Sequence, residues 1–130
     1  MANVAVMRIG VCMGKPFLTS LDVDGWCIDD GEVAHAQSPT TFEIPPHSVR
    51  MNLAVGDTAK LRFYIRVTAD DGELEDYGER MWVEVKGRID DWYRGELLNQ
   101  PDCTPDICPG WEVWFQPRHV IDAHRAADSA

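Results

Sequence analysis

The chain has 130 residues, a formal net charge of −10 and 45% apolar residues. At this length roughly two-thirds of the unfolded surface can be buried, which is enough for one domain with one hydrophobic core. The negative field repels phosphate backbones and anionic lipid headgroups, so we do not expect nucleic acids or membranes as partners. It favours a protein partner with a basic surface or a cationic ligand, or it serves solubility alone.

The amino-terminal residues do not have the pattern of a secretory signal, because Arg8 follows the short apolar run and no long apolar stretch comes next. No window approaches the roughly 20 apolar residues that span a bilayer. We therefore expect a cytoplasmic protein, in which the four cysteines are free thiols.

The amino-terminal third predicts a strand followed by an acidic segment. Residues 3–13 are apolar and β-branched, which is typical of a strand. Residues 22–32 hold five carboxylates and no Lys or Arg, and we expect a solvated loop with a brief strand at Trp26–Ile28. The spacing does not match a calcium loop, because apolar residues stand where oxygen ligands are needed. Residues 46–53 predict a short helix, since proline is tolerated in a first turn.

The clearest strand signal is Thr58–Thr68, which alternates apolar residues with three cations. Residues 70–78 hold five acids and two glycines, and we expect a mobile nine-residue connection to the next strand. We expect its carboxylates to pair with the cations across the strands. If the negative charge serves recognition, these carboxylates are the first candidates for partner binding: Asp70, Asp71, Glu73, Glu75 and Asp76.

Three further strands are predicted in the carboxyl-terminal half, at residues 79–86, 92–99 and 111–115. Gly95 is expected at a bulge or a tight bend. A proline-containing loop at 100–110 and a short turn at 119–122 complete a single domain over residues 1–122, and residues 123–130 are expected to fray. The pattern predicts a mainly β (α+β) fold, either a curled antiparallel sheet or a small SH3-like barrel with one or two short helices.

Three tryptophans extend the candidate partner site: Trp82, Trp111 and Trp114. Trp is rarely fully buried, and an exposed Trp beside carboxylates suits a basic partner. Trp111 and Trp114 are three residues apart on a predicted strand, so we expect them on opposite faces, one in the core and the other exposed.

Four residues have the types and approximate spacing of a two-Cys, two-His zinc site: Cys103, Cys108, His119 and His124. Against a zinc finger stand Pro117, the strand-like residues between the two pairs and a linker shorter than usual. We expect free thiols and no cofactor, and we keep a small metal-binding regulatory domain as an alternative function. No nucleophile elbow, phosphate loop or suitably spaced carboxylate pair is present, so we do not expect an enzyme.

The carboxyl-terminal part resembles the YegJ-like bacterial domain of unknown function. The resemblance rests on four blocks of residues: Glu79-Arg80-Met81-Trp82-Val83-x-Val85, Gly95-x-Leu97-x-Asn99-x-Pro101, Gly110-x-x-Val113-x-Phe115 and His119-Val120-Ile121-Asp122. It places the strand core at residues 79–122, and the chain departs from the pattern at Trp111 and in the loop with Cys103 and Cys108. Related small domains occur among predicted immunity proteins that neutralise toxins.

We therefore expect a non-enzymatic protein-binding module of the immunity or inhibitor type, whose acidic loops and exposed aromatic residues cover a basic site on another protein. Besides the metal-binding alternative, a structural accessory domain without a partner of its own stays open.

Overall fold

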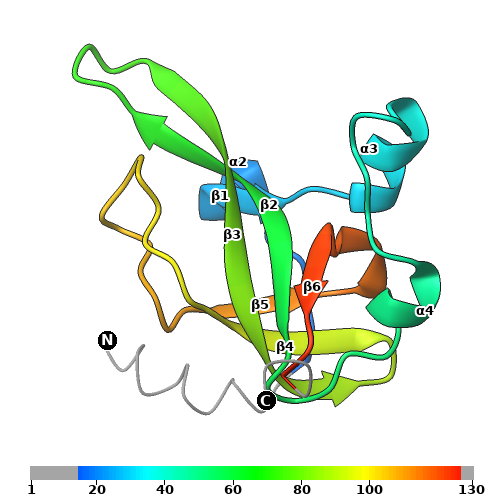
Figure 1. The fold of residues 1–130 in the computed structure, drawn as a ribbon. Helices are drawn as coiled ribbons and strands as arrows, with labels where there is room; N and C mark the ends of the chain where they lie inside the picture. The colour runs from blue at the N-terminus through cyan, green and yellow to red at the C-terminus, as the bar shows by residue number, and fades with distance from the viewer. Residues whose placement is uncertain (1–14, 127–130) are drawn as a thin grey trace.

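Six antiparallel strands form one curled sheet, with short helices at its edge, in the computed structural model, which describes residues 15–126 (Figure 1). The strands run in the order β1-β2-β3-β4-β5, and β6 pairs with β2 beside β1. The sheet closes halfway into a barrel, which confirms the mainly β, curled antiparallel fold. The strands are β1 (Trp26–Ile28), β2 (Thr58–Thr68), β3 (Leu74–Ile89), β4 (Trp92–Leu97), β5 (Glu112–Phe115) and β6 (Asp122–His124).

Strand β2 lies at the centre of the sheet and has the predicted bounds. Its alternate residues Leu61, Phe63 and Ile65 are at most 1% exposed, whereas the cations between them lie on the other face. One edge of β2 pairs with β3 along the whole strand, and the other edge is shared by β1 and β6. The period-two pattern therefore predicted both the strand and its buried face.

Strand β3 is 16 residues long and gives the sheet its curl. Its first part pairs with β2 and its last part with β4, and the β4 register shifts between Val85 and Gly87. Gly95 lies opposite this irregularity and is bonded to both neighbouring strands. A Cβ on Gly95 would lie 2.3 Å from Val83 Cγ1, so only glycine allows the strands to approach here. The prediction of a bulge or bend at this glycine is confirmed.

The core fills the concave side of the sheet with residues from β1 to β5 and from the loops at its ends. Tyr93 of β4 is fully buried, and its hydroxyl donates to the Arg50 carbonyl at 2.7 Å and accepts from the Leu53 N–H at 3.1 Å. These two bonds hold the short helix before β2 onto the core.

The helices of the described part of the chain are α2 (Leu21–Asp24), α3 (Gly31–Gln37), α4 (His47–Arg50) and the 3₁₀ helix η1 (Pro117–His119). The expectation of a solvated acidic loop at residues 22–32 was wrong where α3 forms. Asp30 caps the start of this helix, because its carboxylate accepts a hydrogen bond from the Val33 N–H at 3.0 Å. The short helix after Pro46 is confirmed, although it covers only four residues.

Residues 70–78 are not a nine-residue mobile loop. Pairing between β2 and β3 continues to Thr68 and Leu74, so the connection is a short turn at 69–73. Gly72 has φ +87° in this turn, a conformation that glycine adopts without strain. The sequence was misread because the acids on this part of β3 face solvent and give no apolar alternation.

The expected fraying after residue 122 was wrong for residues 123 and 124, which belong to β6 and pair with β2. Asp57 fixes the next residues, because its carboxylate accepts from the Ala126 N–H at 2.7 Å and from Arg125 Nε at 3.1 Å. The strand predicted at residues 3–13 and the last four residues lie outside the described part of the chain. No helix among residues 15–126 is long and apolar enough to cross a membrane.

Candidate functional site

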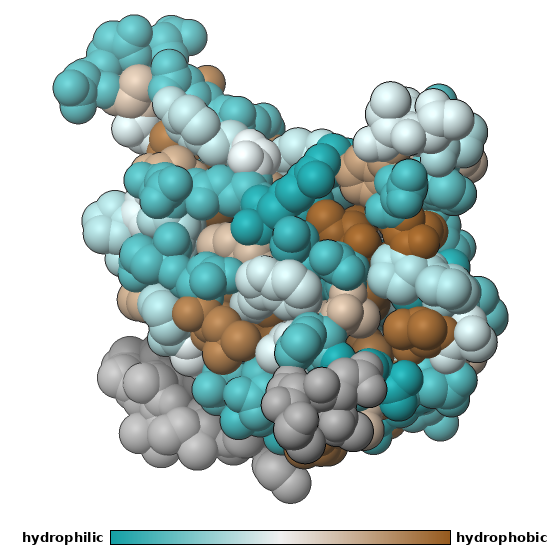
Figure 2. Space-filling view, in the orientation of Figure 1, coloured by the Kyte–Doolittle hydropathy of each residue, from teal (hydrophilic) through white to brown (hydrophobic). Residues whose placement is uncertain are grey.

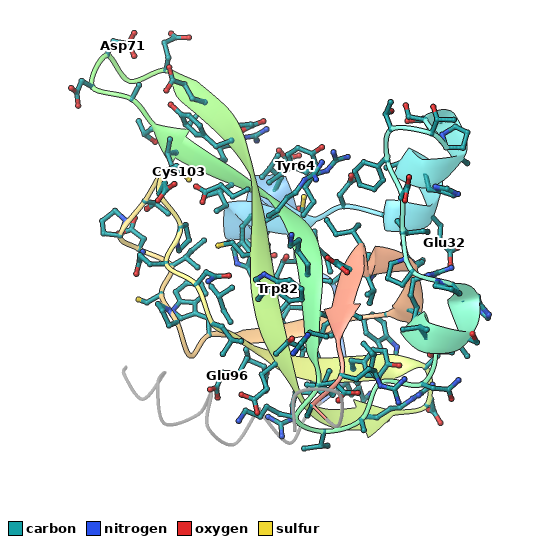
Figure 3. The ribbon with its side chains drawn as sticks, in the orientation of Figure 1. Glu32, Tyr64, Asp71, Trp82, Glu96 and Cys103 are labelled. Atoms are coloured by element: carbon teal, nitrogen blue, oxygen red, sulfur yellow. The ribbon has the colours of Figure 1, made fainter. Side chains whose placement is uncertain are left out.

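The outer part of the β2–β3 hairpin projects from the body of the protein (Figure 1). We call residues 67–77 the hairpin arm. Asp71 lies at its tip (Figure 3), and its visible surface is mainly hydrophilic (Figure 2). Two large apolar residues are nevertheless exposed on it, Leu74 at 62% and Tyr77 at 41%. An exposed Leu and Tyr on a projecting hairpin are accessible to a partner and are not needed for the core.

The base of the arm is held by ion pairs of Arg66. Its guanidinium donates to both Asp76 oxygens at 2.7 and 2.9 Å and to Asp22 of α2 at 2.7 Å. The hydrogen bonds from Arg66 lower the pKa of Asp76. Because these groups are exposed to solvent, the pairs add little to stability and mainly orient the arm. The expected cross-strand ion pairing is confirmed for Asp76.

The other four acids of the arm make no ion pair with any cation of residues 15–126: Asp70, Asp71, Glu73 and Glu75. Asp71 accepts from the Glu73 N–H at 2.9 Å within the turn, and Glu75 accepts from the Tyr77 hydroxyl at 2.7 Å. That hydrogen bond raises the pKa of Tyr77. The tip of the arm thus carries four carboxylates whose charges are not neutralised by the fold.

A cavity of about 510 Å³ lies at the open end of the half-barrel, beside the base of the arm. We call it the open-end cleft. Its apolar walls come from β1, β2 and the loop between β4 and β5, and its polar groups include Asp24, Arg66 and Asp106. Trp111 lines the cleft and is 39% exposed. The apolar wall residues are Trp26, Ile65, Val67 and Ile107.

Cys103 lines the same cleft but is not an activated thiol. Burial, and then its hydrogen bond to Glu79, raises the pKa of the Cys103 thiol to about 11, so it is protonated at neutral pH. Glu79 also accepts from the backbone N–H groups of Asp102 and Cys103, each at 2.9 Å. Although burial opposes it, these hydrogen bonds lower the pKa of Glu79. The hydrogen bonds of Glu79 hold the loop between β4 and β5, which we call the cleft loop, against β3. Cys103 offers no nucleophile.

The structure does not bring the four candidate zinc ligands together. Cys103 lies beside Glu79 of β3, whereas His119 is buried in η1. His124 belongs to β6, where it pairs with Thr58 of β2. Within the described ranges, no group of three or more His, Cys, Asp or Glu residues is placed to hold a metal ion. The geometry therefore gives no support to the metal-binding alternative.

The three candidate tryptophans lie in different environments. Trp111 is exposed and Trp114 is 5% exposed, so the expected division between them is confirmed. Trp82 is half-buried on the solvent face of β3, and Lys60 Nζ lies 5.1 Å from its ring centroid (Figure 3). Through this cation–π contact the Trp82 ring packs against a side chain of the neighbouring strand β2. Of these three candidates, only Trp111 is among the described residues that line the open-end cleft.

Sequence reasoning missed the pairing of the acidic segment at residues 22–32. Four of its five carboxylates form ion pairs with arginines from distant parts of the chain. Nothing local in the sequence signals such contacts. The pairs are Asp22–Arg66, Asp29–Arg62, Asp30–Arg118 and Glu32–Arg50. These acids support the fold, which leaves the arm and the open-end cleft as the candidate site.

Comparison with protein-family models, curated proteins and solved structures found no match for this chain. The YegJ-like resemblance therefore stays a prediction.

Proposed function

We propose that this protein is a non-enzymatic protein-binding module of the immunity or inhibitor type, which covers a basic surface of another protein with its hairpin arm. The observation that carries the proposal is the arm itself: four carboxylates without a cation partner among residues 15–126 surround the exposed Leu74 and Tyr77. Apolar residues that lose water on binding supply affinity, and the charges around them steer the encounter.

The charge of the whole chain supports the same partner chemistry. A net charge of −10 accelerates association with a positive surface and disfavours association with other acidic proteins. The arm extends this field away from the body, so a partner meets the carboxylates before it meets the sheet (Figure 2).

The test begins with capture of partners from a lysate of the native host at low and at high salt. Binding of a recovered partner is then measured with the variant Asp70→Asn, Asp71→Asn, Glu73→Gln and Glu75→Gln. We expect the association rate to fall by about tenfold and to depend less on salt. A Leu74→Ala variant should instead raise the dissociation rate, because it removes buried apolar contact.

The matched control removes the same number of charges elsewhere, at exposed acids outside the arm and the cleft: Glu43→Gln, Asp90→Asn, Asp91→Asn and Asp122→Asn. The control should change the association rate much less than the arm variant does. Equal effects of the two variants would mean that net charge alone, and not the arm, drives binding. If no captured protein binds more weakly to the arm variant, the proposal is wrong.

A further inference from the structure

The open-end cleft has a mixed polar and apolar lining that includes an exposed aromatic ring. Its walls are the core side chains Trp26, Ile65 and Ile107, each at most 9% exposed, and Trp111 adds an indole that is 39% exposed. The volume of about 510 Å³ lies in the range of ligand pockets and exceeds a single side chain. The cleft therefore has room for a long side chain together with part of its main chain.

The charges around the cleft select the sign of its ligand. Asp24 and Asp106 line it, and neither forms an ion pair with a Lys, Arg or His of the described chain. Among the described residues that line it, the one cation is Arg66, which already binds Asp22 and Asp76. Negative charge thus exceeds positive charge around the cleft, and an anionic ligand is repelled.

We infer that the open-end cleft binds an arginine side chain of the partner protein, an inference that rests on the proposed function. The aliphatic stem of arginine packs against the apolar walls, and its planar guanidinium stacks on the Trp111 indole. The guanidinium donors are then free to reach the Asp106 carboxylate and the Asp24 oxygen that does not accept from the Ser20 N–H. Lysine fits less well, because its ammonium is compact and strongly hydrated and does not stack.

The position of the cleft supports its use by the same partner. Val67 lines the cleft and begins the hairpin arm, so the two surfaces are continuous along β2. A basic segment that contacts the carboxylates of the arm can place one arginine in the cleft without crossing the body of the protein. This continuity links the two parts of the candidate site.

The test uses N-acetyl-arginine amide as the probe, titrated into the full chain labelled with ¹⁵N. The Trp111 indole resonance is assigned by its loss in Trp111→Phe, and we expect it to shift with a dissociation constant in the millimolar range (on the order of 1 mM). The citrulline amide has the same shape without the charge and should bind about tenfold more weakly. The lysine amide should fall between the two.

The variant Asp106→Asn should weaken arginine binding several-fold and leave citrulline binding unchanged, whereas the control Glu43→Gln, outside the cleft, should change neither. Equal binding of arginine and citrulline amides, or no shift of the Trp111 indole, overturns the inference. Because the probe needs no partner, that result leaves arm-dependent capture intact. Arginine binding without any arm-dependent partner would instead remove the proposed function and keep a cation-binding cleft.

Discussion

At the scale of single residues, His119 shows how a side chain predicted as a metal ligand has a different role in the fold. It is 1% exposed, and its Nδ1 accepts from the Gln116 N–H at 2.9 Å. The ring proton therefore sits on Nε2, which has no hydrogen-bond partner in the described part of the chain. Burial, aided by Arg118, lowers the pKa of His119 from 6.5 to about 4.

This lowered pKa predicts a loss of stability in mild acid. Between pH 6.5 and about 4 the unfolded chain binds a proton at His119 that the folded chain does not. The free energy of unfolding therefore falls as the pH drops through this window, by up to roughly 3 kcal/mol. The loss is measured by urea unfolding of the wild type and of His119→Asn, each at about pH 7 and about pH 4.5. Because both chains have the same carboxylates, the difference between their losses of free energy reports on His119. If the two proteins lose the same free energy on acidification, His119 does not carry the effect.

At the scale of secondary-structure elements, the junction of β3, β4 and β5 decides the shape of the sheet. The register shift in β3 and the missing side chain at Gly95 let three strands bend around one point. The bend brings the loop between β4 and β5 under the base of the arm, where its residues complete the open-end cleft. One glycine thus links the curl of the sheet to the candidate site.

Gly95→Ala is accordingly expected to destabilise the fold strongly. Its Cβ would lie 2.3 Å from Val83 Cγ1 and 2.9 Å from Phe115 Cε1, and both neighbours are fully buried. We expect the free energy of unfolding to fall by roughly 3 kcal/mol or more, measured by urea denaturation. The control Gly87→Ala should change it by about 1 kcal/mol or less, because its Cβ would meet only the flexible Arg94 side chain, no closer than 3.7 Å. Similar stability of the two variants would contradict this account of the curl.

At the scale of the whole molecule, the fold separates residues that the sequence spacing suggested as one zinc site. Cys103 is in the cleft loop, His119 is in the core and His124 is in β6. We expect purified protein to contain much less than one zinc per chain, and a chelator to shift the melting temperature by less than about 1 °C, because a metal that bound the folded state would stabilise it. One zinc per chain, together with a lower melting temperature after chelation, would show that these residues rearrange around a metal.

The sequence by itself determined the strand β2 and its buried face, the special role of Gly95 and the division between Trp111 and Trp114. Each of these follows from local rules, namely the two-residue period of a strand and the rule that a glycine inside a strand marks a bulge or a close approach. The mainly β class followed from the same signals.

Only the tertiary structure decided the length of the arm, the ion pairs of the acidic segment, the pairing of β6 and the open-end cleft. The physical reason is that each depends on contacts between residues far apart in the chain, such as Asp30 with Arg118 and Thr58 with His124. Local alternation carries no information on such distant partners. The residues of the arm were therefore singled out from the sequence by their charge, whereas their arrangement on a projecting hairpin beside a cleft became visible only in the fold.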